Sequence, residues 1–500
     1  MKYSFRKHAF LLEFGSTHIV NHKHTVFERK QFTRINVSDF APLSRDHSFL
    51  DGITARQRCV FNRLATAIGV SGLCFPSITA FGLSWVFFAI FASLILWRLF
   101  LILVGAAIQL APSRTTGVAM SAGEHPTYTV MVAAYQEAGL MEQLARALSK
   151  LDWPQNRMEI LLLLEADDLD TRNAASRAKF PSGTKILLVP PGGPRTKPNA
   201  LNYGLKHASG EYLVIYDVED LPAPSQIKKA HAVFELSGPA TVCLQARLAA
   251  DNIKPGWLAA QWALEYDVQF GLLLTGTAIC RLPVLLGGTS NHFRTQALRK
   301  LGGWDAWNVT EDADLGMRIA RSGQAVRRLN CVTYEDAPAS LKVWLPQRSR
   351  WLKGYLQTWL VLMRRPRETL RNVGLGRFIA IQASLGGAIL APLFHLPLAL
   401  LVIAISASDD LDLGLIGMSL LIGGYAVSFL GDLCAPGRWT RSRLAAMLTK
   451  PLYWPLLSLA AYRAVWALAE RPYFWAKTPH EPRLTEPRPC STGSSAQPSP

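Results

Sequence analysis

The stretch "EYLVIYDVED", Glu211 to Asp220, joins a short apolar run to a cluster of acidic residues. Three similar apolar runs precede it: "YTVMVAA" from Tyr128, "MEILLLLEADD" from Met158 and "KILLVP" from Lys185. Helical patterns, "AGLMEQLARALSKL" and "PNALNYGLKHAS", lie among them. Short apolar runs that alternate with helices predict an α/β fold, in which a mostly parallel sheet carries helices on both faces.

Polar residues follow these runs at the points where the predicted strands end. In a parallel sheet a ligand binds beyond the carboxyl ends of the strands, so we interpret these residues as one group. Single acidic residues at strand ends are often only turn formers. Several acidic clusters at one edge would repel one another unless they held a cation, and oxygen ligands suit a hard divalent ion. The group contains Tyr135, Gln136, Glu137, Glu165, Asp167, Asp168, Lys197, Asp217, Glu219 and Asp220.

Asp217 and Glu219 alternate on an extended segment, so both carboxylates can point at one ion. We predict that this ion is Mg²⁺ or Mn²⁺ bound to a diphosphate. There it would neutralise the charge that develops on a departing nucleoside diphosphate.

A second acidic cluster lies in "VTEDADLGMRIARSG", Val309 to Gly323, which contains Glu311, Asp312 and Asp314. One interpretation is a helix N-terminus capped by Thr310, where the helix dipole favours acidic residues. The other is that one carboxylate acts as a general base on an acceptor hydroxyl. The cluster alone does not decide between them.

The segment "QRSRW" places Gln347, Arg350 and Trp351 at spacings i, i+3 and i+4, so they share one face of a helix. That face offers an amide, a cation suited to phosphate and a flat ring on which a sugar can stack. Trp344, Lys353 and Trp359 nearby also suit an amphipathic helix on a membrane surface. The two interpretations are compatible.

Long apolar blocks flank the segment from Ser113 to Leu370, and hydrophobic residues make up 49% of the chain. The block from Leu64 to Pro112 is long enough for two membrane crossings of about 20 residues each. Phe378 to Ala407, interrupted by Pro392 and Pro397, is compatible with one kinked helix or with a short hairpin. Further apolar blocks run from Leu413 to Leu433 and from Pro451 to Leu468.

The net charge of +17 is concentrated beside these blocks, which favours an anionic lipid surface over nucleic acid. By the positive-inside rule the soluble domain is expected in the cytoplasm. The basic residues concerned are Arg56, Arg58, Arg63, Arg364, Arg365, Arg367, Arg371, Arg377, Arg438, Arg441 and Arg443.

The sequence predicts six regions. They are an N-terminal region without an assigned role (1–60), two transmembrane helices (61–112), a cytoplasmic catalytic domain (113–345), interfacial helices (346–375), a C-terminal transmembrane region (376–470) and a disordered tail (471–500).

In their order and spacing, these motifs resemble the membrane-embedded family 2 glycosyltransferases, which include bacterial cellulose, curdlan, chitin and hyaluronan synthases. The resemblance covers roughly Tyr128 to Thr358 and the flanking apolar helices. "QRSRW" matches the family's QxxRW signature and is the most specific motif. The others are "AYQE" at 134–137, the acidic strand end at 165–168, the DxD-like "DVED" at 217–220 and "TED" at 310–312.

The resemblance implies a GT-A type (Rossmann-like) fold and an inverting, metal-dependent enzyme. Such an enzyme uses a UDP-sugar, here expected to be UDP-glucose, to elongate a β-linked polysaccharide and pass it across the membrane. Its partners would be the donor, the growing glycan, the bilayer and accessory export or regulatory subunits. Alternatives are the transfer of one sugar to a lipid acceptor, and an inactive membrane scaffold.

The resemblance also assigns roles to residues. Asp312 would be the base, and Asp217 and Glu219 would hold the metal ion, although the second DxD position is here a Glu. Asp167 or Asp168, with Asp168 favoured, would contact the nucleotide. The remaining substrate-binding residues would be Tyr135, Glu137, Lys197, Glu311, Gln347, Arg350 and Trp351.

Overall fold

Eight strands form one mixed sheet in the computed structural model, which describes residues 43–110, 125–250, 256–406, 411–437, 439–475, 477, 478 and 482. The predictions for residues 1–42, for 113–124 and for most of the tail lie outside the described residues. The strands are β1 (Tyr128–Ala134), β2 (Met158–Glu165), β3 (Thr184–Val189), β4 (Tyr212–Tyr216), β5 (Leu221–Pro222), β6 (Thr241–Ala250), β7 (Asn291–Arg294) and β8 (Ala325–Glu335).

The strand order is β3-β2-β1-β4-β7-β6-β8-β5. The first four strands are parallel, as the alternating runs predict. β7 then pairs antiparallel with both β4 and β6, and β6 and β8 are again parallel. The predicted α/β class is therefore confirmed.

Alternation along β1 explains why the sheet is covered on both faces. Tyr128, Val130 and Val132 pack into one buried cluster, whereas Met131 belongs to a second cluster that also contains Leu201. Because successive side chains of a strand point to opposite faces, an uninterrupted apolar strand requires helices on both sides.

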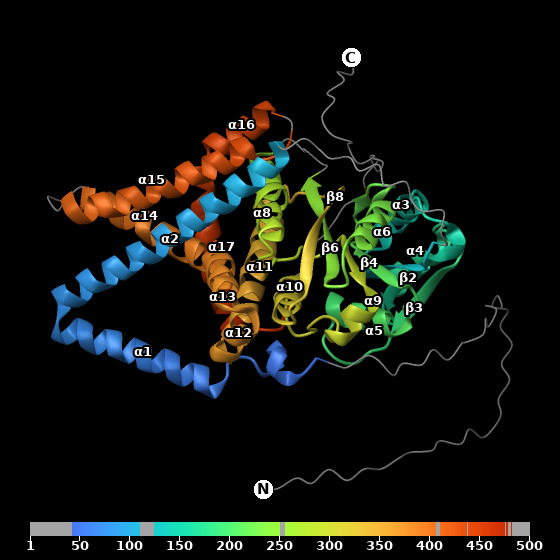
Figure 1. The fold of residues 1–500 in the computed structure, drawn as a ribbon, viewed down its shortest axis with the longest axis horizontal. Coiled ribbons are helices and arrows are strands. Elements are labelled where there is room, and N and C mark those ends of the chain that lie inside the picture. The colour runs from blue at the N-terminus through green and yellow to red at the C-terminus, as the bar shows by residue number, and fades with distance from the viewer. Residues whose placement is uncertain are drawn as a thin grey trace, which may run out of the picture. The chain divides into compact units, whose positions relative to one another are not determined.

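Short and medium helices connect the strands and cover the sheet (Figure 1). They are η3 (Ala138–Leu140), α3 (Met141–Ser149), η4 (Gln155–Arg157), α4 (Leu169–Arg177), α5 (Lys197–His207), α6 (Gln226–Leu236), α7 (Trp257–Tyr266), the π-helix η5 (Asp267–Leu273), α8 (Leu274–Ile279), α9 (Thr295–Lys300) and α10 (Glu311–Arg321). The N-terminal helices are η1 (Arg45–His47), η2 (Phe49–Asp51), α1 (Ala55–Cys74) and α2 (Pro76–Leu110). The C-terminal helices are α11 (Leu341–Leu362), α12 (Pro366–Val373), α13 (Leu375–Ile381), the π-helix η6 (Gln382–Gly386), α14 (Gly387–Ser406), α15 (Leu411–Cys434), α16 (Arg441–Leu448) and α17 (Lys450–Glu470).

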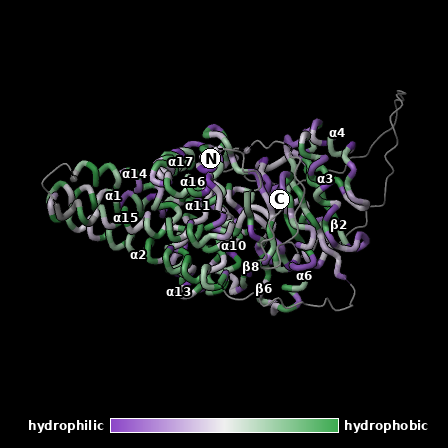
Figure 2. Tube along the Cα trace, turned by 90° about the horizontal axis from the view of Figure 1, so that it is seen from above, coloured by the Kyte–Doolittle hydropathy of each residue, from purple (hydrophilic) through white to green (hydrophobic). Residues whose placement is uncertain are grey.

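Three helical segments among the described residues are long and apolar enough to cross a membrane: Pro76–Leu110, Leu375–Ala404 and Gly417–Cys434. We call them the candidate membrane helices. Figure 2 shows the hydrophobic colouring concentrated on this part of the chain. The second segment joins α13, η6 and α14 into one continuous helix with Pro392 and Pro397 inside it, so the hairpin alternative is not observed.

Helix α11 connects the sheet domain to the candidate membrane helices (Figure 1). It packs against α10 on one side and against α14 and α17 on the other. The contact with α10 depends on Gly354, because a Cβ atom there would lie 2.2 Å from the Thr310 hydroxyl oxygen. Since α10 begins at the acidic cluster, this close packing fixes where Glu311 and Asp312 lie.

The first residues of the predicted disordered tail instead pack on α11. Lys353 donates hydrogen bonds to the carbonyl oxygens of Arg471 and Phe474, and Gln357 donates one to that of Pro472. These contacts hold residues 471–474 against α11, so this part of the predicted tail is packed on the protein.

Candidate active site

One cavity of about 640 Å³ begins at the carboxyl ends of β1, β2 and β4. It is lined there by Tyr135, Glu137, Glu165, Asp217 and Glu219. The structure thus brings these five residues of the predicted group together at one edge of the sheet.

Lys197, the first residue of α5, lies among these carboxylates. Its ammonium forms an ion pair with Asp217 and donates a 2.7 Å hydrogen bond to the carbonyl oxygen of Gly288. Burial works against the charged form of Lys197, but Asp217 and Glu311 outweigh burial and raise its pKa. The side chain therefore stays a fixed positive charge in the cavity.

A further pair of carboxyl groups lies behind Asp217 and Glu219. Burial and the neighbouring carboxylates raise the pKa values of both Asp220 and Glu335. Asp220 Oδ1 and Glu335 Oε1 are buried and have no hydrogen-bond partner among the described residues. This part of the site therefore holds several carboxyl oxygens that could bind a metal ion, and few cations.

Such oxygen donors suit Mg²⁺ or Mn²⁺. In the described part of the chain, no group of three or more His, Cys, Asp and Glu side chains is arranged to hold an ion alone. Mg²⁺ is usually held by one or two carboxylates together with the phosphates of a substrate, and Asp217 and Glu219 both line this edge. The residues at this edge therefore fit the predicted ion.

Asp312 lies at the start of α10 and lines the cavity. One of its carboxylate oxygens accepts a 2.8 Å hydrogen bond from the N–H group of Ala313. The other oxygen faces Gly288, where a Cβ atom would lie 3.5 Å away. Since Lys197 bonds to both Asp217 and Gly288, the acidic group and Asp312 lie in one neighbourhood.

Burial raises the pKa values of both Asp312 and Glu311, and that of Glu311 reaches about 8. Asp314 instead forms a buried ion pair of 2.7 Å with Arg318 inside α10. Thr310 occupies the N-cap position, but its side chain makes no capping hydrogen bond. Of the three acidic residues, Asp314 is thus structural, and Glu311 and Asp312 face the cavity.

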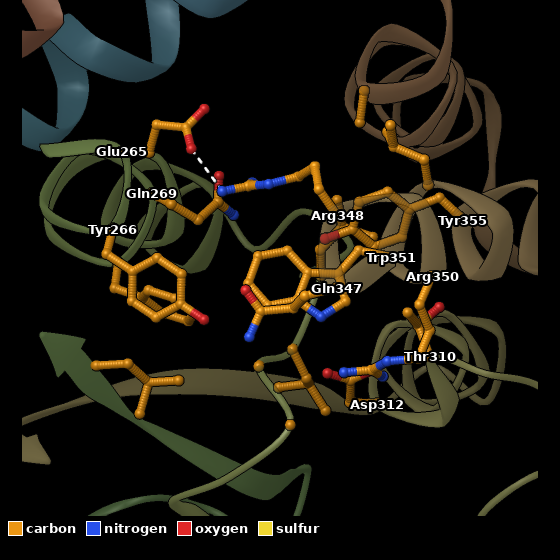
Figure 3. A pocket seen from close by; sticks show the side chains of 18 of the residues that line it. Glu265, Tyr266, Gln269, Thr310, Asp312, Gln347, Arg348, Arg350, Trp351 and Tyr355 are labelled. Atoms are coloured by element: carbon orange, nitrogen blue, oxygen red, sulfur yellow. Dashed lines mark hydrogen bonds and ion pairs between the residues drawn. The ribbon is translucent and has the colours of Figure 1, made fainter. Parts of the chain in front are cut away.

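The predicted face of α11 also lines the cavity. Gln347, Trp351 and Tyr266 turn toward one another, with Arg350 beside Asp312 (Figure 3). The rings of Trp351 and Tyr266 lie 6.0 Å apart with an interplanar angle of 31°. Gln347 Oε1 is buried without a hydrogen-bond partner in the part of the chain that the structure describes, so it can accept one from a ligand.

Arg350 is held by two contacts. Its guanidinium donates to the carbonyl oxygen of Val309, just before α10, at 3.1 Å. It also lies 4.5 Å from the ring centre of Trp475, which belongs to the tail. Lys477, two residues further on, pairs with Glu137 at 3.0 Å. The tail therefore contacts two of the predicted motifs at once.

The structure does not place Asp167 and Asp168 on the cavity wall. Asp168 caps α4, accepting hydrogen bonds from the backbone N–H groups of Thr171 and Gln136. Asp167 forms a half-exposed ion pair with Arg195, a residue that does line the cavity. The predicted nucleotide contact of these residues stays a prediction.

Several cavity residues were not among the predicted set. Arg348, whose only signal was its place inside "QRSRW", pairs with Glu265 of α7 at 2.6 Å. The π-helix η5 carries Gln269, and Trp475 and Lys477 belong to the tail. No local sequence pattern marks Gln269, Trp475 or Lys477, because only the tertiary fold brings them to the cavity.

In the described residues, a mixed α/β sheet thus presents carboxylates beyond its parallel strands to the cavity that Gln347, Arg350 and Trp351 also line. Residues 125–354 match the family described as "Glycosyltransferase like family 2". The match supports a family 2 glycosyltransferase domain in this segment and a transferase as the class of enzyme.

Curated relatives share this part of the chain. A probable glycosyltransferase of Bacillus subtilis, YdaM, is 26% identical over 247 residues, which cover 46% of this chain and 56% of the relative. A beta-monoglucosyldiacylglycerol synthase of Synechocystis is 27% identical over 314 residues, which cover 60% of this chain and 62% of the relative. The cellulose synthase 1 catalytic subunit [UDP-forming] of Komagataeibacter xylinus is 23% identical, covering 48% and 32%. The chain spans little more than half the length of the first relatives.

A solved structure shares the fold. It is the mannosyltransferase PcManGT from Pyrobaculum calidifontis in complex with GDP-Man and Mn²⁺, with a TM-score of 0.50 and 20% identity. The match covers 77% of this chain and 99% of that chain. The expected GT-A type fold is thereby confirmed.

Proposed function

We propose that this protein transfers a sugar from a nucleoside diphosphate sugar to an acceptor hydroxyl, with inversion at the anomeric carbon. The observation that carries the proposal is that Asp312, the acidic edge of the sheet and the Gln347 face of α11 line one cavity. The acceptor oxygen attacks the anomeric carbon and its proton passes to the Asp312 carboxylate. The bond from that carbon to the diphosphate breaks, and the nucleoside diphosphate leaves.

Residues around the cavity support each part of this reaction. Lys197 and Arg350 are partly buried cations that can bind the diphosphate oxygens. Asp217 and Glu219 would hold Mg²⁺ or Mn²⁺, which supplies Lewis-acid stabilisation of the leaving diphosphate when bound. The Trp351 and Tyr266 rings offer a surface on which the acceptor sugar or headgroup can stack.

The direction of the cavity favours an acceptor that comes from a membrane. From the acidic edge it continues between the candidate membrane helices, where aliphatic side chains such as Leu94, Leu398 and Leu421 line it. A wall of this kind suits an acyl chain better than a hydrated glycan. Transfer of one sugar to a lipid is therefore our first candidate, and the beta-monoglucosyldiacylglycerol synthases among the relatives support it.

Elongation of a polysaccharide is the second candidate. The aromatic pair of Trp351 and Tyr266 favours it, because flat rings stack on pyranose faces. UDP-glucose is the proposed donor in both cases, in line with the glucosyl and UDP-forming names of relatives.

We further propose that the catalytic domain lies at the cytoplasmic side of a bacterial inner membrane, with helices in 61–112 and 376–470 embedded in it. The three candidate membrane helices support this arrangement. Of the two helices in 61–112, α2 meets the length and composition needed for a span. The basic residues beside the apolar segments give the orientation.

The test is a donor screen. Purified protein in lipid vesicles would be incubated with labelled UDP-sugars and Mg²⁺ or Mn²⁺, and the label followed into solvent-extractable lipid and into polymer. Labelled lipid of one added sugar supports the first candidate, and labelled polymer the second. Incorporation into neither product, with every donor and both ions, contradicts the proposed function.

A further inference from the structure

Arg98 of α2 lines the cavity at the level where the catalytic domain meets the candidate membrane helices. Arginine in such a helix is costly and usually has a functional partner. Arg98 makes no hydrogen bond or ion pair with the described residues, although Asp432 and Glu265 lie within electrostatic range. A functional partner of the Arg98 guanidinium would therefore be an anion.

Both nearby carboxylates already have partners. Glu265 accepts a 2.6 Å hydrogen bond from Arg348 and a 2.8 Å hydrogen bond from the Tyr453 hydroxyl. Asp432 forms a buried ion pair with Lys450 through one oxygen, and its other oxygen, Oδ1, has no hydrogen-bond partner among the described residues. Each carboxylate is thus matched by one cation, and Arg98 remains as an unmatched positive charge on the cavity wall.

The length of α2 between Pro76 and Arg98 is close to the thickness of the hydrocarbon core of a bilayer. At about 1.5 Å per residue, the helix rises roughly 33 Å from Pro76 to Arg98. The hydrocarbon core of a bilayer is about 30 Å thick. If Pro76 lies at one boundary of that core, Arg98 lies at the other.

The cavity beyond Arg98 is apolar. Leu94 of α2, Ala391 and Leu398 of α14, and Leu421 and Val427 of α15 line it. Polar groups on this wall have partners within the protein: the Trp97 ring N–H donates to the Ser384 hydroxyl at 3.0 Å, and His395 Nε2 is hydrogen-bonded to the Tyr425 hydroxyl at 3.1 Å. A ligand here therefore needs an anionic head and an aliphatic body.

We propose that this end of the cavity binds a phosphate-bearing lipid, with Arg98 on its phosphate and its chains between α2, α14 and α15. The inference rests on the proposed function only in treating the bound lipid as the acceptor of the sugar. The binding itself does not depend on a sugar donor.

The test is equilibrium binding to the purified full chain in detergent, without donor, measured by native mass spectrometry. The probes are phosphatidylglycerol, diacylglycerol with the same chains, and glycerol 3-phosphate. We expect phosphatidylglycerol to bind at least about tenfold more tightly than diacylglycerol. Glycerol 3-phosphate, which lacks the chains, should not displace it at micromolar concentration.

Arg98→Gln should lower phosphatidylglycerol affinity about tenfold, and Arg98→Lys should keep most of it. The matched control is Arg463→Gln, an exposed arginine of α17 outside the cavity wall, which should bind as the wild type does. Equal affinity of the wild type for phosphatidylglycerol and diacylglycerol would overturn the proposal. An equal loss of phosphatidylglycerol affinity in Arg98→Gln and Arg463→Gln would also overturn it. Displacement by glycerol 3-phosphate would reveal a site for free phosphate instead. Because no donor is present, a missing sugar transfer activity would not affect this result.

Discussion

The ammonium group of Lys197 pairs with the carboxylate of Asp217, the first acidic position of the DxD-like motif. The same ammonium bonds to Gly288, which lies against the Asp312 carboxylate. One buried cation thus links the acidic edge of the sheet to the proposed base. This arrangement keeps the excess negative charge around Asp217 partly balanced when no nucleotide is bound.

Removal of divalent ions should abolish sugar transfer, because the leaving diphosphate then lacks its counter-charge. Asp217→Asn should raise the Mn²⁺ concentration for half-maximal rate at least about tenfold, since one anionic ligand is lost. The measurement is a Mn²⁺ titration of the transfer rate. Glu142→Gln on α3, whose carboxylate is 83% exposed, should behave as the wild type. Full activity in excess chelator would contradict the metal assignment.

The buried carboxyl of Glu311 should make stability depend on pH. Its pKa in the folded protein, about 8, lies above the ordinary value of 4.5. The protonated carboxyl therefore stabilises the fold fully below about pH 4.5, and this stabilisation is lost as the pH rises through about 8. The free energy of unfolding should fall by on the order of a few kcal/mol over this range. The melting temperature of the wild type should fall over this range, and that of Glu311→Gln should fall less. If the melting temperature of Glu311→Gln fell with pH as steeply as that of the Glu142→Gln control, Glu311 would not be the cause of the pH dependence.

The tail should contribute to donor binding. Trp475→Ala removes the ring that faces Arg350, a cation–π contact of about 1 kcal/mol, and loosens residues that cover the cavity. We expect KM for the donor to rise several-fold with a smaller change in kcat. Phe474→Ala is the matched control, because this neighbour is 60% exposed and does not line the cavity. Equal KM values in the two variants would show that the tail contact is not used.

Helix α10 should be sensitive to its contact with α11. In Gly354→Ala the new methyl group meets Thr310, so α10 must shift or the packing must strain, at a cost of about 1–3 kcal/mol. A lower melting temperature and a lower kcat should appear together. Gly376→Ala, in α13, is the control, since a Cβ there meets nothing within 4 Å. A Gly354→Ala enzyme with the wild-type melting temperature and kcat would refute this coupling.

The sequence was most informative where local pattern determines structure. The apolar runs at Tyr128, Met158 and Glu211 became β1, β2 and β4 because a buried parallel strand needs a continuous apolar segment. The run at Lys185 became β3, a largely exposed strand at the edge of the sheet. The i, i+3, i+4 spacing of Gln347, Arg350 and Trp351 placed all three on the cavity, since α11 is a regular helix across them.

Other parts of the site depend on contacts between residues far apart in the chain. Trp475 reaches Arg350 only because α11 and α17 pack together and return the chain toward the sheet. The π-helix η5 that presents Gln269 has no sequence signature comparable to a cap or a turn. Asp168 was favoured for the nucleotide, but its carboxylate is engaged as a helix cap, a role that strand-end position alone does not distinguish from ligand binding.

The central claim is that Asp312 is the base that takes the proton of the acceptor. The most direct test measures both the sugar transfer rate of Asp312→Asn and its affinity for UDP. Asparagine keeps the size of the side chain but cannot take the acceptor's proton, so kcat should fall about 10²- to 10⁴-fold while UDP binding and the melting temperature stay near those of the wild type. Asp314→Asn, which weakens the ion pair with Arg318, should instead lower the melting temperature and leave the kcat of the folded enzyme largely intact. Sugar transfer by Asp312→Asn at the wild-type rate would contradict the account.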